Sequence, residues 1–81
     1  MKPEEWNKYA KERLEGRNIK SVSYMTPEEA KKCGWFHRAI VIELDDGTLI
    51  YPSADDEGND AGALFGATKR GKGERFTLPV I

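Results

Sequence analysis

The sequence predicts a single small α+β domain: an antiparallel sheet of three to four strands, with an N-terminal helix and one or two short helices packed on it. Three observations predict this class. They are a helical pattern near the N-terminus, an Asp46-Gly47 turn between two apolar runs, and a terminal run in which Phe76, Leu78 and Val80 alternate. Because 81 residues have room for only one core, we expect one globular domain over 1–81.

Residues 3–15 are predicted to form an amphipathic helix. Pro3 suits the first turn, and Gly16 is placed to end the helix. Four residues recur at three- and four-residue spacing and form a thin apolar stripe: Trp6, Tyr9, Ala10 and Leu14. We expect this stripe to dock on the core.

A strand and a second helix are predicted to follow. Residues 19–25 read as a strand from their Ile, Val, Tyr and Ser content. Thr26 can cap the next helix, and Glu29 can complete a capping box with the Thr26 amide. Gly34 is expected to end this helix after about two turns.

The predicted centre of the sheet is a β-hairpin over 38–52. Asp46-Gly47 is typical of a type I′ turn, in which both central residues have positive φ. This turn pairs Asp45 with Thr48 and predicts two faces. One face is apolar and holds Ile40, Ile42, Leu44, Leu49 and Tyr51, and the other is mixed and holds Val41, Glu43 and Ile50.

The last third of the chain is predicted to be mainly irregular. Residues 53–66 are rich in Asp, Gly, Asn and Ala and read as a loop, with a single helical turn over 61–65. Residues 67–74 are expected to be a basic, mobile linker. A terminal strand over 76–80 is predicted at a sheet edge, because Pro79 cannot donate a hydrogen bond to a central ladder.

The acidic segment 55–60 is a candidate site for a divalent ion. Hard cations prefer clustered oxygen ligands, which here would be Asp55, Glu57, Asn59 and Asp60. The spacing departs from the calcium loop of EF-hands, since position six is Asp60 instead of Gly and position twelve is Gly66 instead of Glu. The alternative is a solvated turn that caps the next element.

The sequence disfavours nucleic acid as a partner. Seven acids and no Lys or Arg lie between Glu43 and Asp60, and such a stretch would repel a phosphate backbone. Aromatic and basic residues do occur together at 35–38, but core packing competes for the two aromatics. The Gly-rich run 66–73 lacks the hydroxyl and the following helix of a phosphate-binding loop.

No pattern of catalytic residues is found, so we expect no enzyme and no cofactor. The single Cys33 and the single His37 have no recognisable activating partner in the sequence. One cysteine cannot form an internal disulfide, which fits a reducing compartment. With no apolar run of membrane-spanning length and no signal-like N-terminus, we expect a cytoplasmic location and no membrane partner.

The sequence therefore predicts a non-catalytic module that binds a protein partner or associates with itself. Trp35, Val41 and Ile50 are the candidate contact residues, because a small hairpin-based domain that exposes them would present a mixed apolar surface. The terminal edge strand offers a second route, by strand addition. The alternative function is a divalent-ion or small-ligand binding domain that uses the acidic loop 55–60.

Overall fold

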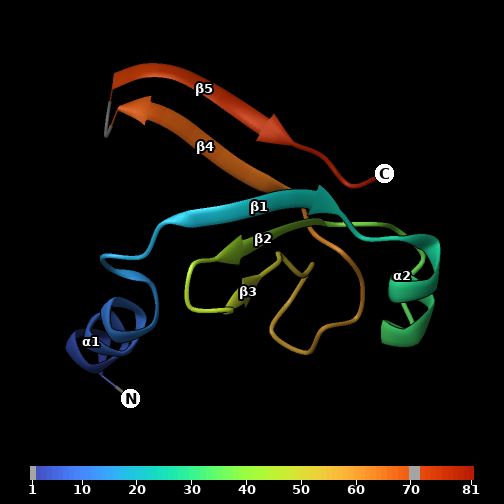
Figure 1. The fold of residues 1–81 in the computed structure, drawn as a ribbon, viewed down its shortest axis with the longest axis horizontal. Helices are drawn as coiled ribbons and strands as arrows, with labels where there is room; N and C mark the ends of the chain where they lie inside the picture. The colour runs from blue at the N-terminus through green and yellow to red at the C-terminus, as the bar shows by residue number, and fades with distance from the viewer. Residues whose placement is uncertain (1, 70–71) are drawn as a thin grey trace.

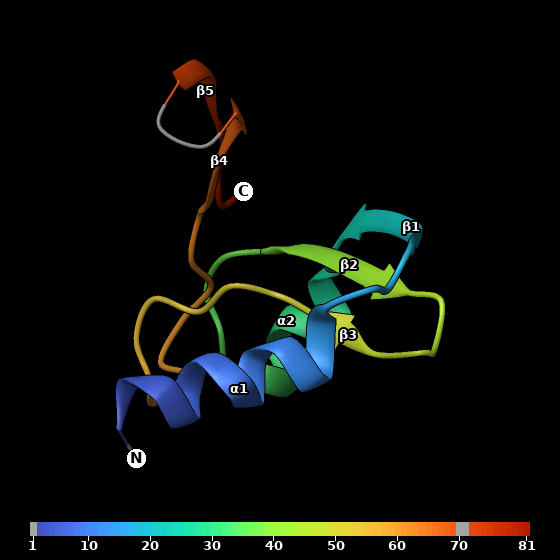
Figure 2. The ribbon, with the colours of Figure 1, turned by 90° about the vertical axis from the view of Figure 1, so that its left-hand side faces the viewer.

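The computed structural model describes residues 2–69 and 72–81 and confirms the α+β class (Figure 1). The elements follow in the order α1 (Pro3–Leu14), β1 (Ile19–Tyr24), α2 (Pro27–Cys33), β2 (Ile40–Leu44), β3 (Leu49–Ile50), β4 (Leu64–Lys69) and β5 (Lys72–Leu78). The first three strands form one antiparallel sheet in the order β1-β2-β3, and β4 and β5 form a separate two-stranded ribbon. Figure 2 shows the ribbon projecting away from the three-stranded sheet.

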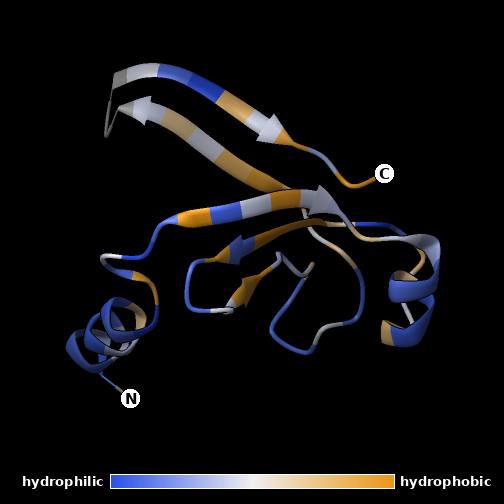
Figure 3. Ribbon diagram, viewed as in Figure 1, coloured by the Kyte–Doolittle hydropathy of each residue, from blue (hydrophilic) through white to orange (hydrophobic). Residues whose placement is uncertain are grey.

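Helix α1 forms where expected but does not dock on the core. Every residue of the helix is exposed, and Figure 3 shows it as largely hydrophilic. Its aromatic side chains instead contact their own helix. The rings of Trp6 and Tyr9 lie edge to face at 5.8 Å, and the Arg13 guanidinium lies 3.9 Å from the Tyr9 ring centroid. The two aromatic residues of the stripe therefore contact each other and Arg13, and none of the stripe is buried against the sheet.

Helix α2 confirms the predicted capping box. Oγ1 of Thr26 accepts a hydrogen bond from the Glu29 amide at 3.1 Å, and Oε1 of Glu29 accepts one from the Thr26 amide at 2.8 Å. The helix ends at Gly34, whose left-handed φ of +76° suits glycine. Ala30 is the one buried residue of α2, and it anchors this short helix to the core.

The hairpin between β2 and β3 forms, but the predicted register was wrong by one residue. Leu44 donates its amide hydrogen bond to the Thr48 carbonyl at 2.8 Å, so the loop holds the three residues 45–47. Only Gly47 in this loop has a positive φ, at +89°, which excludes a type I′ turn. A three-residue loop ending in a left-handed glycine is the next most common hairpin connection. Asp46 supports it by accepting a hydrogen bond from the Thr48 amide at 3.0 Å.

The one-residue shift moves Leu49 and Tyr51 to the opposite face of the sheet from the one expected. The observed pairs place Val22, Ile42 and Ile50 in one row across the three strands on the face away from α2. Leu49 and Tyr51 instead lie with Val41 around a hollow beside α2.

The core is small and lies between α2 and the sheet. Its buried members are Met25, Ala30, Trp35, Ala39 and Ala61, with Val41 and Val80 partly buried against them. The core therefore combines α2, the segments on either side of it, the loop after β3 and the partly buried Val41 of β2. Ile40 and Leu44 of β2 are also buried, but they alternate with Val41 and lie on the face of Ile42, away from α2.

The end of the chain is more regular than predicted. Residues 64–65 belong to β4 and not to a helical turn, and the expected linker 67–74 falls mostly within β4 and β5, although residues 70 and 71 lie outside the described part. The terminal strand ends at Leu78 and pairs with β4 instead of joining the larger sheet. The physical reason is the pairing of Gly66 with Phe76, since the Phe76 ring occupies the space that a Cβ at Gly66 would take.

Candidate functional site

The loop between β3 and β4 is closed by hydrogen bonds between its two ends. Ser53 and Ala61 form an isolated antiparallel bridge. The carbonyl of Asp60 accepts hydrogen bonds from the Ala54 amide at 2.8 Å and from the Ser53 hydroxyl at 3.1 Å. Gly62 permits this closure, because a Cβ there would lie 2.7 Å from the Ser53 carbonyl oxygen. The loop Ser53–Ala61 thus forms a compact flap.

Asp60 fastens this flap to the segment that follows α2. Its Oδ1 accepts hydrogen bonds from the amides of Phe36 and His37, both at 3.1 Å, and from the Ala61 amide at 2.8 Å. Its Oδ2 lies 2.9 Å from Nδ1 of His37. The hydrogen bond with the His37 side chain is the largest cause that lowers the pKa of Asp60 to about 2, with the backbone amides adding to it.

Trp35 is held in the core beneath the same flap. Its indole N–H donates a hydrogen bond of 2.6 Å to the Gly58 carbonyl, its ring lies 6.0 Å from that of Tyr51, and only 8% of the residue is exposed. Trp35, one of the candidate contact residues, therefore exposes only a small part of its surface. Val41 is likewise packed against the core. Ile50 remains half-buried on the other face of the sheet.

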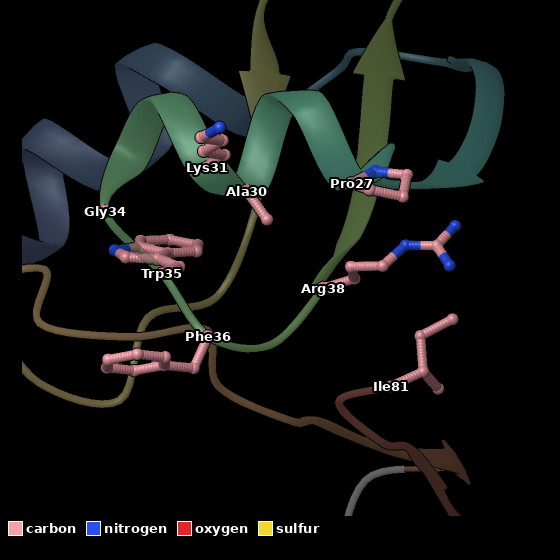
Figure 4. A pocket seen from close by; sticks show the side chains of 8 residues that line it. All are labelled: Pro27, Ala30, Lys31, Gly34, Trp35, Phe36, Arg38 and Ile81. Atoms are coloured by element: carbon pink, nitrogen blue, oxygen red, sulfur yellow. The ribbon is translucent and has the colours of Figure 1, made fainter.

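Phe36, the neighbour of Trp35, is the most exposed large apolar side chain in the described part of the chain, at 91%. It borders an open groove of about 440 Å³ between α2 and the C-terminal segment. Figure 4 shows the Phe36 ring on the side of the 34–38 segment away from α2, with Arg38 and Ile81 farther along. The groove is lined by Pro27, Ala30, Lys31, Gly34, Trp35, Phe36, Arg38 and Ile81.

The walls and the rim of this groove differ in chemistry. Pro27, Ala30 and Ile81 give it apolar walls, while the two charged lining residues, Lys31 and Arg38, are both basic. Arg38 is oriented by a hydrogen bond of 2.6 Å from its Nε to the Met25 carbonyl. The Arg38 backbone exchanges two hydrogen bonds with Ile81, at 2.7 and 3.0 Å, which closes that end of the groove. The groove is therefore apolar inside and positive at its border.

Two carboxylates of the acidic segment, those of Asp55 and Asp60, accept hydrogen bonds from other residues of the protein. Oδ1 of Asp55 accepts hydrogen bonds from the amides of Glu57 and Asn59, and its Oδ2 accepts one from the Asn59 side chain at 2.7 Å. These hydrogen bonds lower the pKa of Asp55, and the bond from the Asn59 side chain has the largest effect. The Asp60 carboxylate accepts hydrogen bonds from the amides of Phe36, His37 and Ala61. Within residues 2–69 and 72–81, no group of three His, Cys, Asp or Glu side chains is placed to hold a metal ion.

The residues with nucleophilic or acid-base chemistry lie apart from one another. His37 contacts Asp60 on the flap, while Cys33 is exposed beside the hollow between α2 and the sheet. Sequence reasoning missed Phe36 as the exposed member of the Trp35-Phe36 pair. No local sequence signal identifies it, because the Phe36 amide is held by Asp60, which is 24 positions away in the sequence.

No protein-family model matches the chain, and neither the curated proteins nor the solved structures compared with it include a significant match. In the described part of the chain, no helix has the length and apolar character needed to cross a membrane. The functional argument therefore depends on this chain's own residues.

Proposed function

We propose that this protein is a non-catalytic module that binds a protein segment in the groove beside Phe36. The observation that carries the proposal is the 91% exposure of Phe36 on a backbone held by Asp60. Leaving a large aromatic ring in water is unfavourable, and rigid aromatic side chains commonly supply most of the binding energy at protein interfaces. Holding the Phe36 backbone in place before binding also reduces the entropy lost on association.

The groove chemistry suggests what kind of segment would fit. An apolar side chain of the partner would enter between Pro27, Ala30 and Ile81, and acidic residues beside it would face Lys31 and Arg38. The volume of about 440 Å³ is in the range of sites that take a few side chains. We therefore propose a partner segment with an apolar anchor flanked by Asp or Glu.

The compartment belongs to the same proposal. Cys33 is an exposed free thiol, and an exposed thiol persists unmodified most readily where the environment is reducing. We infer that the module acts in the cytoplasm.

Site-specific photo-crosslinking in the cells that produce the protein would test this function. A photoreactive phenylalanine analogue at position 36 should yield a discrete adduct with another protein. The matched control carries the same analogue at position 6, where Trp6 is also exposed, at 55%, but borders no part of the groove. Addition of unlabelled wild-type protein should suppress the adduct, and the Phe36→Ala variant should not.

Two results would contradict the proposal. One is the same set of adducts from positions 36 and 6, which would indicate adventitious contact. The other is equal competition by the wild type and by Phe36→Ala. Because Phe36 makes no buried contact, the variant should remain folded, and an unchanged melting temperature would verify this.

A further inference from the structure

The four sheet edges of the molecule differ in how well they are protected from pairing with another strand. In β1, the register shifts between Ile19 and Ser21, a bulge of the kind that disrupts edge pairing. Strand β3 has only two residues and is followed by Pro52. Strand β5 contains Glu74 and Arg75, and charged residues also discourage pairing.

Strand β4 has a register shift of its own, between Ala67 and Lys69, but unlike β1, which also contains Lys20, it has no charge before that shift. Residues 64–68 contain no charge and no proline, and the register with β5 is regular from Leu64 to Ala67. Its second edge pairs with no other strand of the described chain. Phe65 on this strand is 78% exposed. Because an isolated two-stranded ribbon is marginally stable in water, the β4 edge is the place where an additional strand would contribute most.

We propose that two copies of this chain associate through β4, pairing antiparallel about a two-fold axis at Gly66. The product is a continuous four-stranded sheet in the order β5-β4-β4-β5. This surface is separate from the Phe36 groove, so the inference goes beyond the proposed binding function.

The pattern of large and small residues in β4 makes this edge self-complementary. With the two Gly66 residues opposite each other, Phe65 of each copy lies opposite Ala67 of the other. Each large ring would then cover a small side chain. On the other face, the two Phe76 rings lean over the two glycines from both sides, because each already covers its own Gly66. Both faces would gain apolar contacts without a like-charge pair.

The total surface also fits association. The chain exposes 6631 Å², against about 4,900 Å² for a compact protein of this size. Its radius of gyration is 13.9 Å, against about 12 Å for a compact domain. A standard protein interface buries roughly 800 Å² on each partner, which is less than the excess surface of the chain as a whole.

Sedimentation equilibrium of the purified full chain, from micromolar to millimolar concentration, would test the proposal. The wild type should show a reversible monomer–dimer equilibrium. Phe65→Lys should weaken the dimer by about tenfold or more, because it removes an apolar contact and places a charge on the edge. The matched control is Thr77→Lys, which puts the same charge directly opposite on the same face of the ribbon but on β5. It should dissociate no more than the wild type does.

A second measurement locates the contact directly. In a mixture of isotope-labelled and unlabelled copies, intermolecular NMR contacts should join Phe65 to Ala67. A monomer at millimolar concentration would overturn the proposal. So would a dimer that Phe65→Lys leaves intact, or one that only Phe36→Ala dissociates. Loss of photo-crosslinks at position 36 with the dimer intact would refute the binding function alone, which keeps the two proposals distinguishable.

Discussion

The middle of the chain and its two flanks are built differently. Among the described residues, every buried one lies between Met25 and Ala61. Helix α1 before this span contains none, and neither do residues 64–68 and 73–78 of the ribbon after it. The flanks nevertheless have regular secondary structure and aromatic residues. Regular hydrogen bonding therefore does not by itself indicate where a small domain derives its stability.

The ribbon is attached to the middle of the chain at its base. The Tyr24 hydroxyl donates a hydrogen bond of 3.0 Å to the Pro79 carbonyl, and Ile81 exchanges two backbone hydrogen bonds with Arg38. Val80 packs partly against the core. These contacts fix where the ribbon leaves the body but leave most of its length exposed. We thus expect unfolding to be governed by the middle and surface interactions by the flanks.

The largest expected effect is on stability, and it should differ between substitutions at Trp35 and at Trp6. Trp35→Ala should lower the free energy of unfolding by about 3–5 kcal/mol, because it leaves a cavity beneath the flap and removes the hydrogen bond to Gly58. Trp6→Ala should change it by less than about 0.5 kcal/mol, since Trp6 is 55% exposed. Urea unfolding followed by circular dichroism measures both. Equal losses would show that α1 contributes to the core.

If Trp35→Ala does not fold, Trp35→Phe provides the test. It keeps an aromatic ring in the core and removes only the indole N–H, so it should cost about 1–2 kcal/mol. A loss near zero would mean that the bond to Gly58 does not hold the flap.

The next prediction concerns how the stability of the protein changes at acidic pH. Because the pKa of Asp60 falls from 3.8 to about 2 on folding, its carboxylate stabilises the native state above pH 3.8, and that contribution is lost as the pH drops toward 2. Asp60→Asn keeps an oxygen for the amides of Phe36 and His37 but removes the charge. The variant should be less stable at neutral pH, and its stability should vary less across this pH window.

Denaturant titrations at several pH values measure this slope. The control is Asp56→Asn in the same loop, where the residue is exposed. It should leave the slope as in the wild type. A wild-type slope in Asp60→Asn would mean that Asp60 does not fasten the flap.

The smallest expected change in stability comes from a substitution that tests the contact between Gly66 and Phe76 in the ribbon. Gly66→Ala should displace the Phe76 ring, because the added Cβ would collide with it. We expect a change of less than about 1 kcal/mol in the free energy of global unfolding, since Phe76 is 49% exposed. In the wild-type NMR spectrum, the Gly66 α-protons should be shifted upfield by the ring, and Phe76→Leu should abolish this shift. Unshifted Gly66 protons would contradict the cross-strand contact.

Local signals predicted several elements correctly. The Thr26 and Glu29 capping box, the glycine end of α2 and the existence of the hairpin all depend on residues a few positions apart. Helix α1 ends earlier than expected, at Leu14, and its C-cap is Glu15. The hairpin register was wrong for a local reason as well, because Asp-Gly fits two loops of different length. Strand β4 was missed because Gly66 and the alanines beside it are typical of a loop. The cross-strand contact between Gly66 and the Phe76 ring, ten residues later, is not visible in the sequence.

The sequence by itself determined the class of the fold, the positions of both helices and the candidate acidic loop, because capping, helical periodicity and turn chemistry act over short distances. Only the tertiary structure decided that Trp35 is buried while Phe36 is exposed, and that Asp60 binds backbone amides. Those outcomes depend on contacts between the flap and the segment after α2, more than twenty residues apart. Contacts between segments this far apart in the sequence produce no periodic pattern of residues, because they depend on how the whole chain folds and not on neighbouring positions.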